Sequence, residues 1–386
     1  MKRTMKALRS LLSLLVGVAS ILVALTAEAK TPDFSALDSL MKRSVAEGVF
    51  PGASLAVMLH GRTVYHKAFG KLTYDAASAP ADTTTIYDAA SLTKAVVTTS
   101  IAMQLVERDS LHLATPVSRY RPGFAANGKE RITIEQLMRH VSGLRAHAYF
   151  AETCANRDET LQAIDRDTLV SAPGAKTEYS DLNFILLGSI IEQVTGKSLA
   201  ANFHARFSAP LGMNSTMFTP PAALLPRIAQ TGEDGVWTLP RPRPLVNDQN
   251  AALLGGVSGH AGLFTTTGDL IKMVRMLMNG GQLDGKCYIK AATVKRFLKR
   301  TDAPRALGWD LVTPGGKSSA GNRFSANSWG HLGFTGTSIW VDPEKDLAVI
   351  LLSNRVWPTP ENIKIRKFRP MLHDTVVECV EGDGRE

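Results

Sequence analysis

Segments near both ends of this chain have the apolar pattern and the length of β-strands. Residues 53–59 and 62–70 are apolar and rich in residues that favour strands, and the His-Gly dipeptide between them suits a two-residue hairpin turn. Residues 337–342 and 347–353 form a second pair, joined by a four-residue polar turn. The pattern therefore predicts an antiparallel hairpin at each end of the chain.

Helical spacing dominates the middle of the chain. The stretch from Leu92 to Val106 is apolar nearly all round, which predicts a central, buried helix. Gly196 and Thr266 are suited to capping a helix end and a helix start, respectively. A Pro-rich, aperiodic segment predicts a long surface loop that borders a site. The loop covers residues 219–247, and further helices are expected at residues 134–140, 182–194, 270–278 and 361–379.

Strands at both ends with helices between them predict an α/β (α+β) protein. We expect one antiparallel sheet flanked by helices, together with an inserted, all-helical lobe. The sheet lobe would be discontinuous in sequence, and the helical lobe would include the Pro-rich loop. The expected boundaries are residues 30–110 and 255–386 for the sheet lobe and residues 111–254 for the helical lobe.

The composition is that of an ordinary globular protein, with 386 residues, 44% hydrophobic and 20% charged. The formal net charge is +9, of which residues 1–29 carry +3, so that +6 remains for the rest. Because these cations are scattered along the chain rather than packed into a stripe, the charge indicates no nucleic-acid partner.

Residues 1–29 have the features of a secretory signal: a basic start, an apolar stretch and a small-x-small cleavage site, Ala27-Glu28-Ala29. We therefore expect a periplasmic or secreted protein. An uncleaved membrane anchor is the alternative, since about 17 apolar residues lie at the short edge of a spanning helix. Contact with a membrane is expected only in that case.

The three cysteines are far apart and odd in number, with no Cys-x-x-Cys motif. This spacing predicts neither a disulfide framework nor a zinc site, and we expect no metal or other cofactor. Cys154, Cys287 and Cys379 are interpreted as buried free thiols.

Ser91 and Lys94 stand three residues apart at the start of the predicted central helix. Side chains at this spacing project from the same helical face, so a hydroxyl nucleophile and an amine would lie within reach of each other. To act as a base, Lys94 needs a pKa of about 7 to 8 instead of about 10.4, which a buried helix face could supply. The alternative is a solvated or salt-bridged lysine.

Tyr179 precedes the helix that starts near Leu182, so its phenol is expected on a loop of the helical lobe. Near the Lys94 cation the pKa of this phenol would fall, and the two groups would titrate together. The alternative is an aromatic side chain that packs on the helix start.

Other hydrolase patterns are less well represented. The nearest approach to Gly-x-Ser-x-Gly is centred on Ser258 and ends in His260 rather than glycine, which argues against a Ser-His-Asp hydrolase. His140 and His260 are interpreted as loop or packing residues.

Three short motifs follow one another along the chain: Ser91-Leu92-Thr93-Lys94, Tyr179-Ser180-Asp181 and His331-Leu332-Gly333. In order and spacing they resemble those of class C β-lactamases and of related serine esterases and penicillin-binding proteins. In that superfamily the motifs are Ser-x-x-Lys, Tyr-x-Asn, and Lys-Thr-Gly or His-x-Gly. The resemblance covers nearly all of residues 34 to 378.

The resemblance implies the fold described above and a serine hydrolase that forms an acyl-enzyme. By position, Ser91 would attack a carbonyl, and Lys94 and Tyr179 would share the base and acid roles. The backbone N–H groups of Ser91 and of Phe334, on the strand edge that begins at His331, would form the oxyanion hole. His331, Gly333, Phe334 and Asp181 would contact the substrate.

Three departures from the β-lactamase pattern bear on the substrate. His331 replaces a lysine that would attract a carboxylate, and Leu332 replaces a threonine. Asp181 replaces an asparagine that would contact an acyl-amide side chain. These changes favour esters or small amides over β-lactams and leave a peptidoglycan stem peptide open as an alternative.

The expected partner is therefore a small ester, a small amide or a peptidoglycan-derived molecule. The alternative from another class is a penicillin-binding or cell-wall recognition protein that is non-catalytic or releases its acyl group slowly.

Overall fold

The structure is a computed structural model that describes residues 32–232, 246–301, 303, 305–313, 315 and 317–382. The predicted signal segment, residues 1–29, lies outside this range, as do residues 233–245 of the predicted Pro-rich loop. Among the described residues, no helix is both long enough and apolar enough to cross a membrane.

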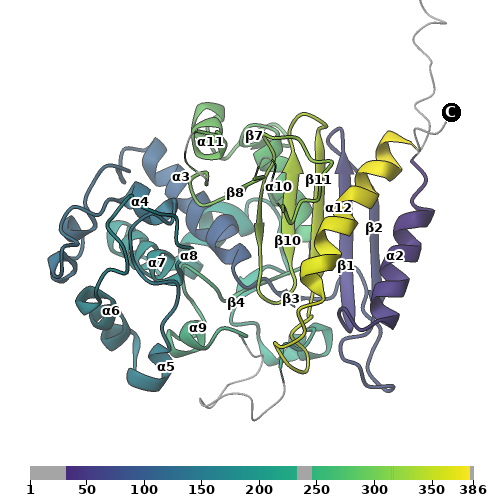
Figure 1. The fold of residues 1–386 in the computed structure, drawn as a ribbon, viewed down its shortest axis with the longest axis horizontal. Helices are drawn as coiled ribbons and strands as arrows, with labels where there is room; N and C mark the ends of the chain where they lie inside the picture. Colours follow the sequence, from purple (N-terminus) through teal and green to yellow (C-terminus); the bar gives the residue numbers. More distant parts are fainter. Residues whose placement is uncertain are drawn as a thin grey trace, which may run out of the picture.

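The centre of one half of the molecule is a six-stranded antiparallel sheet with the order β2-β1-β11-β10-β9-β8 (Figure 1). The two predicted hairpins form its largest part, because β1 pairs with both β2 and β11. At the first turn, His60 and Gly61 both have positive φ, as a tight two-residue hairpin requires. The strands are β1 (Gly52–Leu59), β2 (Arg62–Gly70), β8 (Asp310–Leu311), β9 (Trp329–Leu332), β10 (Ser338–Asp342) and β11 (Leu347–Ser353).

Both faces of this sheet are covered by helices, which explains why its inner strands are mostly apolar and buried at nearly every position. On β11, Val349 and Leu351 face α2 (Ser35–Ala46) and α12 (Ile365–Glu381), which lie side by side (Figure 1). Ile350 and Leu352 face the other way, toward α10 (Thr267–Met278) and the larger core. The predicted fold class, a sheet flanked by helices, is confirmed.

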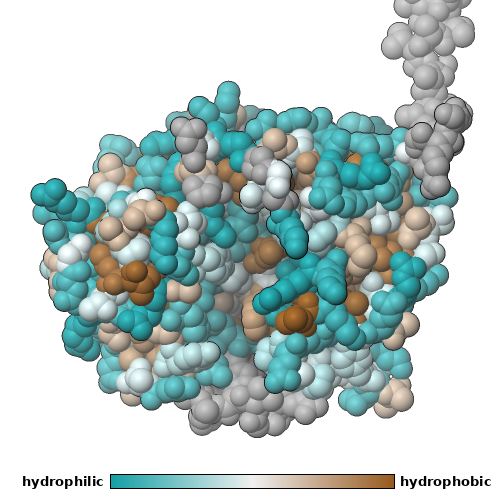
Figure 2. Space-filling model, in the orientation of Figure 1, coloured by the Kyte–Doolittle hydropathy of each residue, from teal (hydrophilic) through white to brown (hydrophobic). Residues whose placement is uncertain are grey.

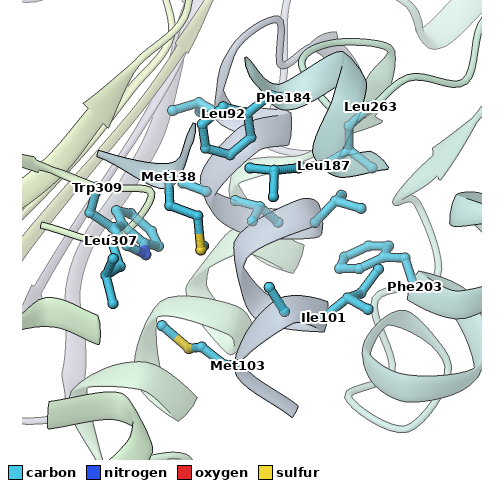
Figure 3. Packing of buried hydrophobic residues seen from close by; sticks show 14 of the residues in the cluster. Leu92, Ile101, Met103, Met138, Phe184, Leu187, Phe203, Leu263, Leu307 and Trp309 are labelled. Carbon is cyan, nitrogen blue, oxygen red and sulfur yellow. The ribbon is translucent and has the colours of Figure 1, made fainter. Parts of the chain in front are cut away.

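A buried helix connects the sheet to the helices at the other side of the molecule. It starts as a π-helical turn, η1 (Lys94–Thr99), and continues as α3 (Ser100–Glu107). Its side chains are buried on all faces, as its apolar sequence predicts. Figure 3 shows Ile101 and Met103 of this helix among apolar residues from distant segments, such as Phe203 and Trp309.

Short helices surround the far side of this central helix (Figure 1). The longest is α7, which ends at Gly196 in the left-handed conformation, as predicted. Thr266 caps α10 by accepting from the Asp269 amide, also as predicted. The other elements of this part are η2 (Val117–Arg119), η3 (Pro122–Ala125), α4 (Ile134–Met138), α5 (Phe150–Thr153), α6 (Arg157–Arg166), α7 (Asp181–Thr195), α8 (Leu199–Phe203), η4 (His204–Ser208), η5 (Ala222–Arg227) and α9 (Gln249–Leu253).

Several short elements are not visible in the sequence pattern. Strands of two or three residues show no periodicity, so their sheets could not be predicted. They form a three-stranded sheet, β3 (Tyr87–Asp88), β5 (Leu263–Thr265) and β4 (Met217–Phe218), and a small hairpin, β6 (Gln282–Leu283) and β7 (Lys286–Cys287), which is followed by α11 (Ala291–Leu298). The predicted lobe boundaries stay a prediction, because one hydrophobic cluster includes residues of both the sheet and the surrounding helices.

Two expectations were wrong in detail. The last helix begins at Ile365 rather than at residue 361, because Arg355 occupies the carbonyl groups of Pro360 and Asn362, each at 2.7 Å. The three cysteines are free, but Cys379 alone is buried, and Cys287 is exposed because it lies on the β6–β7 hairpin.

Figure 2 shows that hydrophobic residues on the viewed face form small, separate patches.

Candidate active site

A strained turn places Ser91 at the start of the central helix. Ala90 has φ 47°, a left-handed conformation that costs an L-residue about 1 to 2 kcal/mol. The buried carboxylate of Asp88 stabilises this turn by accepting from the Ala90 amide at 2.8 Å and from the Asn247 amide at 2.6 Å. Ser91 therefore lies partly exposed beside fully buried neighbours.

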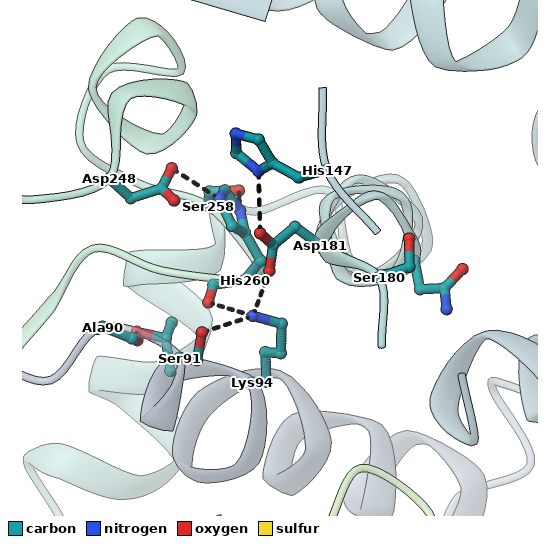
Figure 4. Close-up of polar contacts among 12 residues, drawn as sticks. Ala90, Ser91, Lys94, His147, Ser180, Asp181, Asp248, Ser258 and His260 are labelled. Atoms are coloured by element: carbon teal, nitrogen blue, oxygen red, sulfur yellow. Dashed lines mark hydrogen bonds and ion pairs between the residues drawn. The ribbon is translucent and has the colours of Figure 1, made fainter. Parts of the chain in front are cut away.

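Lys94 is fully buried and reaches the Ser91 hydroxyl (Figure 4). Its Nζ donates to Ser91 Oγ at 2.9 Å and to the backbone oxygen of His260 at 3.1 Å. Its third partner is the carboxylate of Asp181, with 2.7 Å between Nζ and Oδ1. All three N–H groups of an ammonium are thus engaged, so Lys94 in this state donates to Ser91 instead of accepting its proton.

The charge of Asp181 decides the ionisation of Lys94. Burial opposes the lysine's charge, but the attraction of Asp181 outweighs it, so the pKa of Lys94 is raised above its ordinary value. Burial likewise opposes the charge of Asp181, yet Lys94 and His147 hold the pKa of this carboxyl well below its usual range. The expected lowering of the Lys94 pKa is therefore wrong for this state.

Tyr179 lies between Lys94 and His140. Its ring centroid is 4.9 Å from Lys94 Nζ and 4.6 Å from the centroid of the His140 ring. Burial raises the pKa of Tyr179 and outweighs the lysine's attraction, so the expected fall is also wrong. The Ser180 amide donates to His140 Nδ1 at 3.0 Å, so His140, predicted as a packing residue, supports the Tyr179 loop.

The turn after β9 packs against the segment that precedes the nucleophile. Thr335 Oγ1 donates to the backbone oxygen of Asp88 at 2.8 Å, and Thr337 Oγ1 donates to the backbone oxygen of Ala89 at 3.1 Å. A Cβ at Gly333 would stand 2.6 Å from the Ala89 oxygen, so glycine permits this approach. Phe334 lies in this turn rather than on the strand edge, because β9 ends at Leu332.

The amides of Ser91 and Phe334 share one property. Within the part of the chain that the structure describes, neither N–H donates to another residue. Two backbone donors without partners, on segments that pack together, are what an oxyanion hole requires.

His331 is buried on β9 and carries no charge at neutral pH. Its Nδ1 lies 2.8 Å from the Leu332 oxygen, so this nitrogen carries the proton of the neutral imidazole. Burial lowers the pKa of His331 to about 4, well below the ordinary value for a histidine. The His331 ring centroid lies 6.0 Å from that of Tyr179.

Three further polar residues border the site and are missing from the predicted set (Figure 4). His147 Nδ1 lies 3.2 Å from the second oxygen of Asp181, and no motif could have indicated it. Asp248 belongs to the segment that follows the predicted loop and contacts His260 Nε2 at 2.8 Å. The imidazole of His260, predicted to be a packing residue, is buried and also contacts Ser258.

One cluster of three side chains has the composition of a metal site. Ligand atoms of Asp181, Asp248 and His260 lie within 4.8 Å of one another. In the structure each atom contacts a neighbouring side chain, so these residues form a connected polar network beside Lys94.

The architecture and the three assembled motifs define a serine hydrolase of the β-lactamase and penicillin-binding type. The profile of the Beta-lactamase family matches residues 37–369, and the chain belongs to this family. It is 33% identical over 361 residues to a putative D-alanyl-D-alanine carboxypeptidase of Escherichia coli O157:H7, covering 83% of this chain and 81% of the relative.

Two further similarities agree with this assignment. The chain is 32% identical over 368 residues to an N-acetylmuramyl-L-alanine amidase of Bacillus subtilis strain 168, covering 86% of this chain and 82% of the relative. A penicillin-binding protein homologue from Caulobacter crescentus has a similar structure, with a TM-score of 0.70, 20% identity, and 90% and 97% of the two chains covered.

Proposed function

We propose that this protein is an exported hydrolase that forms an acyl-enzyme on Ser91 and cleaves small amides or esters, peptidoglycan-derived amides above all. The observation that carries the proposal is the 2.9 Å contact between Ser91 Oγ and a fully buried Lys94, beside Tyr179. The expected signal segment supports export. Two relatives named for cleaving amide bonds of the cell wall support the substrate class.

In the proposed mechanism, the pair formed by Lys94 and Tyr179 first gives up one proton to solvent. Ser91 Oγ then attacks the substrate carbonyl carbon, and the Ser91 proton passes to the deprotonated member of this pair. The carbonyl oxygen becomes an oxyanion that accepts from the Ser91 and Phe334 amides, each donor contributing about 2.7 to 4 kcal/mol. The same pair returns the proton to the leaving amine or alkoxide, and water then releases the acyl group from Ser91.

The ion pair between Lys94 and Asp181 argues against a β-lactam substrate. Asp181 holds Lys94, so it does not offer the amide donor that the asparagine of the related motif offers. His331 is neutral and offers no positive charge to a substrate carboxylate. Neither feature helps to bind a substrate carboxylate, so among cell-wall amides we expect those without a carboxylate beside the scissile bond to react faster than the D-Ala-D-Ala peptide.

A fluorophosphonate probe tests the nucleophile directly. Mass spectrometry should find the adduct on the Ser91 peptide in the wild type and no adduct in Ser91→Ala. Ser258→Ala is the matched control, because it removes another serine hydroxyl near the site, one that contacts His260, and should still be labelled on Ser91. A probe that enters the site and leaves Ser91 unmodified would contradict the proposal.

A substrate panel tests the reaction class. It comprises p-nitrophenyl esters, a D-Ala-D-Ala peptide, N-acetylmuramyl-L-alanine and a chromogenic cephalosporin, each compared with Ser91→Ala. We expect turnover of an ester and of one cell-wall amide, with the cephalosporin slowest. If an acyl adduct on Ser91 instead persists for hours, the protein is a cell-wall recognition protein that is acylated but does not turn over.

A further inference from the structure

A cavity lies away from Ser91, at the other end of the central helix. Its volume is about 560 Å³, and it is bordered by the end of α3, the end of α7, α8 with the following η4, and β7. The helix from Lys94 to Glu107 separates it from the nucleophile by about 20 Å at 1.5 Å per residue. A ligand here would therefore not occupy the acyl-transfer site.

The cavity is lined by four cations and by no carboxylate. The cations are Arg108, Lys197, Arg206 and Lys286. None of the four has an ion-pair partner among the described residues. The nearby Glu107 accepts from the Lys290 amide and from Thr293 instead. Like charges gathered around one cavity repel one another, and an anion would relieve that repulsion.

Arg206 is fixed in place by neutral groups. Its Nε donates to Asn202 Oδ1 at 3.2 Å, and its Nη1 donates to Gln104 Oε1 at 3.1 Å. Both amides are buried and are held in turn, since Asn202 donates to Thr195 at 2.7 Å and Gln104 to the Tyr288 oxygen at 2.8 Å.

These contacts orient the Arg206 guanidinium without neutralising it. Burial and the neighbouring Arg108 lower the pKa of Arg206, as expected for a cation that lacks a counter-ion. A rigid guanidinium with a free edge is well suited to binding phosphate oxygens.

We propose that this cavity binds a phosphate-bearing ligand, with Arg206 as the central contact and Arg108, Lys197 and Lys286 completing the charge. Its volume is that of a small-molecule site rather than that of a single ion, so the phosphate belongs to a larger molecule. Two sources share this chemistry: a soluble phosphate ester and the headgroup of an anionic lipid. This inference goes beyond the proposed hydrolase activity and does not depend on it.

Binding of inorganic pyrophosphate to the full chain, measured by calorimetry at low salt, tests the soluble source. The lipid source is tested by co-sedimentation with phosphatidylglycerol vesicles, with phosphatidylcholine vesicles as the neutral reference. Binding should be equal in Ser91→Ala, because the cavity is separate from the nucleophile. It should weaken as salt rises toward about 0.15 M, because part of the charge is exposed.

Two variants and one control make the test specific. Arg206→Gln should weaken binding about tenfold through loss of a charge-assisted contact. The double variant Lys197→Gln/Lys286→Gln changes exposed residues alone and should weaken binding without affecting the fold. Arg296→Gln, an exposed arginine of α11 outside the cavity, should bind as the wild type does.

Each result decides the proposal. Pyrophosphate binding with this variant pattern supports a soluble ligand, and vesicle binding alone with the same pattern supports a lipid headgroup. Absence of both, or binding that both cavity variants retain in full, overturns the proposal.

Discussion

The two ends of the central helix hold positive charge in opposite ways. At one end, Lys94 is fully buried and its ammonium is compensated by the carboxylate of Asp181. At the other end, Arg206 is held by two neutral amides, and no carboxylate lines the cavity around it. A buried charge needs an internal partner because desolvation is costly, whereas a partly exposed charge can remain available to a ligand. We therefore expect the charge of Lys94 to serve the proposed catalysis and that of Arg206 to serve the proposed ligand binding.

Removing the compensated charge should have the largest effect. Lys94→Ala leaves the Asp181 carboxylate buried without its partner, which should lower the free energy of unfolding by about 3 to 5 kcal/mol. Turnover should fall by about 10³-fold or more, because the proton-transfer pair is lost. Denaturant unfolding and kcat/KM for a p-nitrophenyl ester measure the two effects.

The double variant Lys94→Ala/Asp181→Asn is the matched control for stability. It removes both charges, so stability should recover by at least half while activity stays low. If the single variant is as stable as the wild type, the ion pair does not compensate a buried charge, and the contrast between the two ends of the helix fails.

Asp181→Asn removes the carboxylate that compensates the charge of Lys94. Lys94 would then resemble Arg206, which contacts neutral amides. Because Asp181 raises the pKa of Lys94, the substitution should lower it. If the free amine is the base, the rising limb of kcat/KM against pH moves to lower pH by about one unit or more. A limb that does not move assigns the base role to Tyr179 instead.

The sequence predicts those features that repeat or that depend on local chemistry. The two hairpins, the central helix and the Gly196 cap follow from periodicity and capping, and all are present. The three motifs are also brought together: Lys94 contacts Ser91 and lies against the Tyr179 ring, whose centroid is 6.0 Å from that of His331.

What the sequence could not predict depends on contacts between distant segments. The pKa of Lys94 is raised rather than lowered because Asp181, 87 positions further along the chain, reaches its Nζ. His147 belongs to no motif, yet it lies against the same carboxylate. The sequence around Arg206 gives no sign that Gln104 and Asn202 hold its guanidinium.

His147→Gln tests how much His147, the exposed neighbour of Asp181, adds to the stability of the fold. The hydrogen bond to Asp181 raises the pKa of His147, while Asp248 adds attraction and Lys94 opposes it. Protonated His147 therefore stabilises the fold below about pH 6.5, and this contribution is lost as pH rises through the folded-state pKa. The stability difference between wild type and variant should be larger at about pH 5.5 than at about pH 8.5. An equal difference at both values would show that His147 does not share the charge of Asp181.

The smallest expected effect concerns His331, a buried histidine of the nucleophile's site. Because burial lowers the pKa of His331 to about 4, the imidazole stays neutral from about pH 5.5 to about pH 8. The ratio of kcat/KM for a carboxylate-bearing ester to that for its neutral analogue should therefore stay flat over this range, after correction for ionisation of the substrate. His331→Gln, which keeps a neutral polar group, should give the same flat ratio. A ratio that rises toward pH 5.5 in the wild type and not in the variant would mean that His331 becomes charged and attracts the carboxylate. A further positive charge would then lie near Tyr179 besides those of Lys94 and Arg305, and the contrast with the cavity around Arg206 would narrow.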